Sequence, residues 1–130
     1  MNWKSRRRIL AVHEHLHKIE IGRLSKLERA ARDLKEEEAR IVGYLDGNRE
    51  MIAMFPDIVL ERLKSNIRRQ QDMLKEVERQ TDLTLEQARR VKQAERLVDN
   101  AEQAREQALE LEALREILEH HSHMTDLSAR

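Results

Sequence analysis

Residues 43–57 read GYLDGNREMIAMFPD and contain two of the three glycines of the chain and its only proline, Pro56. Proline is favoured in the first turn of a helix and disrupts a helix interior. Glycine and asparagine are common where a helix stops. We therefore expect one helix to end in this stretch, the chain to turn within residues 46–57, and a second helix to begin at Pro56.

Apolar residues recur at spacings of three and four on both sides of this turn, which is typical of a coiled-coil seam, the stripe along which two helices pack. The series before the turn comprises Ile9, Val12, Leu16, Ile19, Leu27, Ala31, Leu34, Ile41, Leu45 and Ile52. The series after it comprises Leu60, Leu63, Ile67, Gln70, Leu74, Val77, Thr81, Thr84, Ala88 and Val91, and a later stripe, shifted once in phase, runs from Ala94 to Leu118. The gap between Leu16 and Leu27 predicts a stutter in the first helix.

The composition favours a narrow seam over a thick globular core. The 130 residues include only three aromatic side chains, and charged residues make up 38% of the chain. We therefore predict an all-α protein in which two long helices form an antiparallel coiled-coil hairpin with a C-terminal helix overhang. The expected boundaries within a single domain, 1–130, are about 5–53 for helix one, about 56–122 for helix two, and 123–130 for a loose tail.

The predicted second helix is longer than the first by roughly 18 residues, or ~27 Å at the helical rise. From about Gln103 onward it would have no partner helix in the same chain. This overhang still carries apolar side chains, which we expect to bind another protein: Leu109, Leu111, Leu114, Ile117 and Leu118. Residues 95–119 contain eight acidic residues and three arginines. The expected partner surface is therefore basic and hydrophobic.

The N-terminus carries a cationic cluster, Arg6, Arg7 and Arg8, beside Lys4 and Trp3. A solvated helix start is the simplest interpretation, although cations at a helix start oppose the helix dipole. They could contact an acidic protein face or anionic lipid. We treat the three arginines as candidate partner-binding residues and keep the solvated helix start as the alternative.

Several function classes are disfavoured by what the chain contains. Basic and acidic residues are equal in number, at 25 each, which argues against a general nucleic-acid binder. There is no cysteine, and no uncharged stretch approaches the ~20 apolar residues that span a bilayer. The sequence has no phosphate-binding glycine loop, no HExxH and no nucleophile elbow. We expect no enzyme activity and no cofactor.

The six histidines form the nearest approach to a metal-binding motif. They lie in two clusters: His13, His15 and His17, and His120, His121 and His123. Two histidines four residues apart on a helix can chelate a transition metal, but a third ligand is needed. Because the overhang would separate the clusters, we expect exposed surface histidines and no metal site, although an effect of pH on partner binding remains open.

The second half of the chain carries a family resemblance. Met54-Phe55, Arg62-Leu63, Leu85-Glu86, the run RVKQAERL at 90–97 and the Ala- and Glu-rich stretch to Glu112 resemble the FliJ-like flagellar export proteins and the related YscO-like proteins of virulence type III secretion. The resemblance implies an antiparallel coiled coil similar to a rotary stalk, without catalytic residues. It also implies an export ATPase, the export gate and export chaperones as partners.

From this resemblance we expect a non-enzymatic accessory or stalk protein of a flagellar or related type III export apparatus. The expected location is the cytoplasm or the cytoplasmic face of the inner membrane. Two alternatives remain. One is a homodimeric coiled-coil spacer or adaptor in which two overhangs pair. The other is a peripheral membrane protein anchored by its basic N-terminus.

Overall fold

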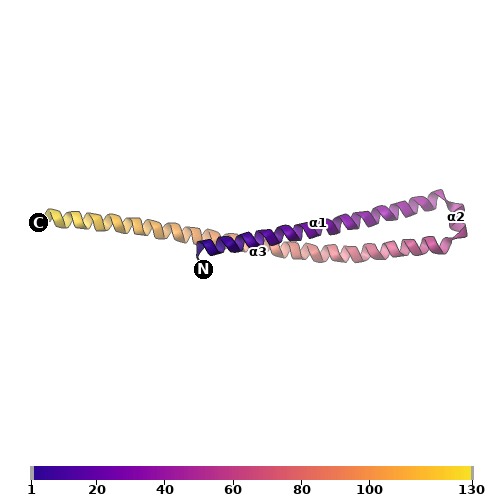
Figure 1. Ribbon diagram of the computed structural model, residues 1–130, viewed down its shortest axis with the longest axis horizontal. Coiled ribbons are helices and arrows are strands. Elements are labelled where there is room, and N and C mark those ends of the chain that lie inside the picture. Colours follow the sequence, from indigo (N-terminus) through magenta and orange to yellow (C-terminus); the bar gives the residue numbers. More distant parts are fainter. Residues whose placement is uncertain (1, 130) are drawn as a thin grey trace. The chain divides into compact units, whose positions relative to one another are not determined.

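A computed structural model describes residues 2–129 and places three helices in them: α1 (Trp3–Gly47), α2 (Arg49–Met54) and α3 (Pro56–Ala129). This described part of the chain contains no strand. Long segments of α1 and α3 pack against each other, and α2 lies between them in the sequence (Figure 1). The all-α prediction is therefore confirmed.

The helix boundaries follow the breakers that the sequence places in 43–57. Helix α1 ends at Gly47, earlier than the predicted 53, because Asn48 leaves the helix and its side-chain amide donates a hydrogen bond to the carbonyl of Tyr44 (3.2 Å). A six-residue helix, α2, follows and was not predicted as a separate element. Helix α3 begins at Pro56, as predicted.

The C-terminal end of α3 corrects the predicted tail. Helix two was expected to end near 122 and residues 123–130 to be loose, yet α3 continues to Ala129. No glycine or proline follows Pro56, and Thr125 and Ser128 each donate a hydroxyl hydrogen bond of 2.9 Å to the carbonyl four residues earlier. The last predicted tail residue, Arg130, lies outside the described residues.

The chain divides into two compact units. Unit 1 comprises residues 1–14 and 89–130, and unit 2 comprises residues 15–88. Each unit pairs a part of α1 with a part of α3, and unit 2 also contains α2. The prediction of one single hairpin across the whole chain stays a prediction.

In unit 2, α1 and α3 lie side by side in a hairpin-like arrangement joined through α2 (Figure 1). The buried side chains of this unit are mixed in polarity: Leu34, Ile41, Asn66, Gln80, Thr84 and Gln87. A seam of this kind buries less apolar surface than an all-leucine seam, and its polar members must find hydrogen-bond partners. Every one of these buried amides and hydroxyls therefore constrains how the two helices pack.

The part of the α1 seam that lies in unit 2 keeps a regular spacing of three and four, so the predicted stutter is wrong. The residues turned toward α3 are His17, Glu20, Leu24, Leu27, Ala31, Leu34, Glu38 and Ile41. The predicted Leu16 and Ile19 are exposed instead. The sequence pattern missed this phase because it counted only apolar residues, whereas a histidine and a glutamate occupy the inward positions.

The α3 seam of unit 2 matches the prediction at several positions and differs by one residue at three others. Leu63, Gln70, Val77 and Thr84 lie in the seam as expected. Leu60, Ile67 and Leu74 are exposed, and Val59, Asn66 and Met73, each one residue earlier, take their places. The apolar face of this helix is wider than the seam, so apolar spacing alone did not identify the contacting edge.

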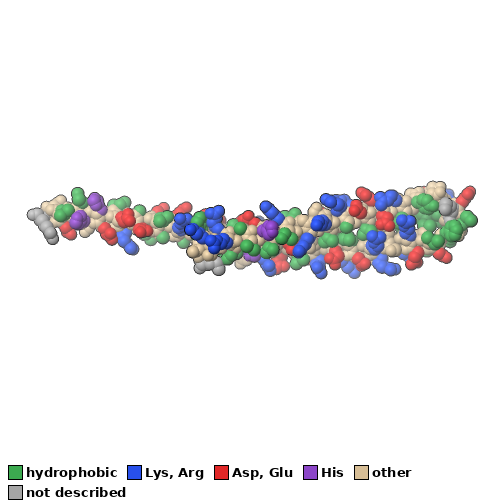
Figure 2. All heavy atoms as spheres, in the orientation of Figure 1, with side chains coloured by type: hydrophobic (Ala, Val, Ile, Leu, Met, Phe, Trp, Pro, Cys, Tyr) green, Lys and Arg blue, Asp and Glu red, His purple; other side chains and the backbone are tan. Residues whose placement is uncertain are grey.

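In unit 1, the first turns of α1 pack on the stretch of α3 that follows Arg89. Ala94 and Val98 are buried there, and Ala101 is the last half-buried residue of α3. Small side chains at these positions allow the two helices to approach closely. From Glu102 to Ala129 every residue is exposed, and apolar side chains remain visible along that segment (Figure 2).

Candidate protein-binding surfaces

The exposed segment of α3 contains all five of the apolar residues that the sequence proposed for partner binding. Leu109, Leu111, Leu114, Ile117 and Leu118 are between 52% and 65% exposed. Because these side chains are exposed, they are not part of the packed interface between α1 and α3 in unit 1. The structure thus places these side chains where a partner could reach them, and their binding role stays a prediction.

Helical spacing separates these five residues into two groups. Leu111, Leu114 and Leu118 share one face, since they are three and four residues apart, and Ile117 borders it. Leu109 is nine residues from Leu118, which at 100° per residue places it on the opposite side of the helix. The four residues of the first group form a continuous stripe, called here the α3 stripe, and Leu109 lies outside it.

Acidic residues follow the same helical rhythm on a different face of this segment. Glu112, Glu116 and Glu119 are four and three residues apart and are all exposed. Residues 103–129 contain six acidic residues and two arginines. The segment is therefore negatively charged: these three glutamates lie on the side of the helix away from the α3 stripe, and Glu110, four residues before Leu114, lies on the same face as the stripe.

The three N-terminal arginines have different environments in unit 1. The Nη1 atom of Arg6 donates a hydrogen bond to the carbonyl of Leu97 (3.0 Å), and its side chain is half-buried. Arg7 and Arg8 are both exposed, and the guanidinium of Arg7 lies 5.0 Å from the centre of the Trp3 ring. Arg6 thus packs within unit 1, Arg7 combines solvent exposure with a contact to Trp3, and Arg8 is an exposed side chain.

Trp3 is the centre of a small cluster that sequence reasoning missed. Arg105 lies 4.7 Å from the ring centre, and the indole Nε1 donates a hydrogen bond to Glu102 (3.1 Å). Two cations near one indole stabilise it by cation–π attraction. Glu102 and Arg105 are three residues apart on α3, so once one of them is known to contact Trp3, helical spacing points to the other. The sequence offers no signal that identifies the first contact. Insertion of Trp3 into a lipid surface would break these contacts, which weighs against the membrane-anchor alternative.

Because Trp3 is the only tryptophan, its fluorescence reports on this cluster directly. We expect Arg105→Ala to shift the emission maximum to longer wavelength and to raise quenching by acrylamide, at a cost to stability of only about 0.5–1 kcal/mol. Arg115→Ala, on the same exposed segment, should leave both properties unchanged. Equal spectra for Arg105→Ala and the parent chain would contradict the stacked arrangement.

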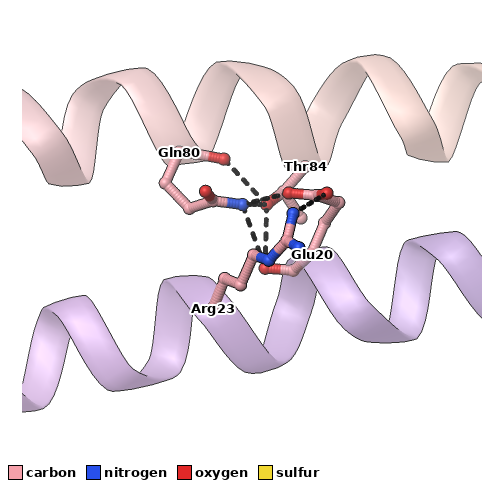
Figure 3. A network of polar contacts seen from close by, with 4 residues as sticks. All are labelled: Glu20, Arg23, Gln80 and Thr84. Carbon is pink, nitrogen blue, oxygen red and sulfur yellow. Dashed lines mark hydrogen bonds and ion pairs between the residues drawn. The ribbon is translucent and has the colours of Figure 1, made fainter.

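A polar network crosses the seam of unit 2 near Glu20 (Figure 3). The side-chain amide of Gln80 donates hydrogen bonds to the carbonyl of Glu20 (3.2 Å) and to its carboxylate, and the Thr84 hydroxyl lies 3.4 Å from the same carbonyl. Arg23 forms an ion pair of 3.0 Å with the Glu20 carboxylate. The carbonyl and the carboxylate of Glu20 thus both have polar partners, and we interpret Glu20 as a structural residue of the seam.

A second network lies further along the seam, around Asn66. The Nδ2 atom of Asn66 donates to the carbonyl of Leu34 (3.0 Å). The Nε2 atom of Gln70 lies 2.6 Å from the Asn66 Oδ1 and 2.7 Å from a carboxylate oxygen of Glu38. Buried amides in a helical seam fix which residues face each other, since a shifted pairing leaves them without partners.

The histidines differ from the expected exposed set. His13, in unit 1, and His17, in unit 2, are half-buried, while the other four are exposed. Their positions follow the seam spacing, which explains their burial. Within residues 2–129, no group of three His, Asp or Glu side chains is arranged to hold a metal ion. No helix in the same range is long and apolar enough to cross a membrane.

No family model matches this chain, and no curated protein or solved structure is similar to it at a significant level. The residues themselves must therefore carry any proposal of function. Among the described surfaces, the α3 stripe combines exposure, apolar character and adjoining charge in one continuous segment.

Proposed function

We propose that this protein is a non-enzymatic coiled-coil accessory or stalk protein of a flagellar or related type III export apparatus. In this proposal α1 and α3 form an antiparallel coiled-coil hairpin, and the C-terminal end of α3 overhangs it and binds a partner. The candidate partners are the export ATPase, the export gate and export chaperones. The single structural observation that carries the partner-binding role is the continuous exposure of α3 from Glu102 to Ala129.

The order of the contacts in unit 2 supports the antiparallel direction. Glu20 meets Gln80, and Leu34 meets Asn66. Moving forward along α1 from the first pair to the second corresponds to moving backward along α3 by the same number of residues. This is the relation expected of two helices that run in opposite directions along a shared seam.

The α3 stripe supports a protein partner of a particular kind. Its leucines have no cover in their own unit, Glu110 lies on the same face, and Glu112, Glu116 and Glu119 add negative charge on the rest of the helix. An amphipathic helix of this type fits a hydrophobic groove with basic edges, where apolar anchors supply affinity and the charges steer the encounter. The partner surface should therefore contain arginine or lysine around an apolar floor.

The assignment to an export apparatus rests on the resemblance of residues 54–112 to the FliJ-like and YscO-like proteins. A long helical pair with an exposed end suits a stalk that reaches into a ring-shaped ATPase or toward a gate. A pair of helices without a deep polar pocket suits a role in association more than one in chemistry. The mechanism would be mechanical and associative.

Binding to purified components tests this proposal. We expect the chain to bind a flagellar export ATPase, or the cytoplasmic part of the gate, with a Kd of roughly 1 μM, or about −8 kcal/mol. Surface plasmon resonance at several salt concentrations should show weakening as salt rises, because charge steers the contact. If no export ATPase, gate domain or export chaperone binds at 100-fold higher concentration, the export role is wrong.

A homodimeric spacer is the second candidate, because an uncovered apolar stripe can also pair with its own copy. Charge weighs against it, since two copies of the acidic segment would bring like charges together. Sedimentation equilibrium separates the two candidates. A monomer at high concentration excludes the spacer, whereas a tight dimer that ignores export components would replace the proposed function.

A further inference from the structure

An apolar groove lies at the α2 end of unit 2. Its volume is about 590 Å³, and α1, α2, α3 and the residue that joins the last two all contribute to its lining. The apolar lining residues are Ile41, Tyr44, Ile52, Phe55, Ile58 and Val59. Figure 2 shows hydrophobic side chains gathered at this end of the hairpin-like unit. The groove is separate from the α3 stripe, which belongs to unit 1.

The groove is built by the same breakers that shape the turn. Ile41 forms a buried floor, while Phe55 is 52% exposed and Ile58 is 67% exposed. Phe55 stands between α2 and α3, and Pro56 fixes the first turn of α3 beside it. These large apolar side chains are held at the surface by the backbone, and a contiguous patch of this kind marks an interaction site.

Charge at the edge of the groove indicates what it prefers. Three charged residues line it: Glu37, Arg40 and Arg62. The Glu37 carboxylate lies 3.7 Å from the guanidinium of Arg69, so a third arginine already offsets its charge. The charge of the lining residues is therefore set by Arg40 and Arg62, and the edge of the groove is positively charged.

We infer that this groove binds an amphipathic helix of a partner protein that carries carboxylates beside its apolar face. One or two apolar anchors, a turn apart, would fill the space between Ile41 and Ile58, which is the usual geometry of a helix in a groove. Glutamate or aspartate flanking these anchors would pair with Arg40 and Arg62. The inference does not depend on the proposed export role, because it concerns a different unit and a different surface.

Synthetic peptides test the inference on the full-length chain. The first probe is a fluorescein-labelled helical peptide of 16 residues with leucine at positions i, i+3, i+4 and i+7 and glutamate at the flanking positions. The second has lysine in place of each glutamate. We expect the acidic peptide to bind in fluorescence anisotropy with a Kd of about 10–100 μM, and the basic peptide to bind at least ~10-fold more weakly.

Variants identify the groove as the site. Ile58→Asp should weaken binding of the acidic peptide ~10-fold or more, because it places a carboxylate on the apolar lining. Arg62→Glu should reduce the preference for the acidic peptide over the basic one. Leu60→Asp is the matched control: Leu60 is 52% exposed on the same turn of α3 but does not line the groove. It should bind like the parent chain.

Three outcomes would overturn the inference. One is equal binding of the acidic and basic peptides, or no binding of the acidic peptide at 1 mM. Another is a loss with Leu60→Asp as large as the loss with Ile58→Asp. The third is a self-association in sedimentation velocity that Ile58→Asp abolishes, since the groove would then be an interface between copies. Circular dichroism of each variant should match the parent, because all three substituted side chains are exposed.

Discussion

Replacing Leu111 and Leu118 together with aspartate is expected to abolish co-purification of the chain with an export ATPase or gate protein. Both leucines belong to the α3 stripe and are more than half exposed. Two charges on an apolar binding face should weaken association at least ~100-fold, or about 3 kcal/mol. Helicity should stay nearly unchanged, because neither side chain packs against another helix in unit 1.

The matched control carries two leucine-to-aspartate changes elsewhere on α3. Leu74 and Leu85 are exposed to a similar degree but lie in unit 2. This double variant should co-purify with the partner as the parent chain does. Loss of partner with both double variants would show a general effect of added charge. Loss of helicity in the first variant would show instead that the stripe belongs to the folding core.

The largest effect on stability is expected from Leu34→Ala. Leu34 is only 6% exposed and sits in the seam of unit 2, where its backbone carbonyl also receives the Asn66 amide. Truncating a buried leucine removes apolar contacts and leaves a cavity, at a cost of about 2–4 kcal/mol in the free energy of unfolding. Thermal melts followed by circular dichroism should show a Tm lower by roughly 10 °C.

Leu74→Ala is the informative comparison, because apolar spacing places Leu74 in the seam as firmly as Leu34. The structure leaves Leu74 exposed and puts Met73 inward. Its truncation should therefore change the free energy of unfolding by no more than about 0.5 kcal/mol. A loss for Leu74→Ala as large as for Leu34→Ala would mean that α3 presents its other edge to α1.

The sequence identified the main features of the fold because few residues determine them. A single proline and two clustered glycines mark the turn, and apolar spacing identifies two long helices. The contacting edge of each helix was harder to identify, since polar residues such as Glu20, Asn66 and Gln80 occupy seam positions. Their burial depends on hydrogen bonds to the facing helix. The spacing of residues along a single helix does not show which groups on the other helix it will meet.

The candidate surfaces were predictable to differing degrees. The exposed leucines followed from the unequal lengths of the two helices, which a count of residues provides. The contacts made by Arg6 and Trp3 could not be predicted from such a count. These contacts, to Leu97, Glu102 and Arg105, depend on where the first turns of α1 meet α3. The apolar groove at the α2 end also depends on the break at Asn48, which creates a separate short helix.

The polar seam has a consequence for how unit 2 responds to force. Sliding α1 along α3 by one heptad would separate Asn66 from Leu34 and Gln80 from Glu20 at the same time. Each buried amide left unpaired costs about 1–3 kcal/mol, so the two penalties add before any new pairing forms. An all-leucine seam lacks this polar contribution to the barrier, because its side chains have no hydrogen bonds to lose. The buried amides therefore raise the free-energy barrier to sliding of α1 along α3 in unit 2.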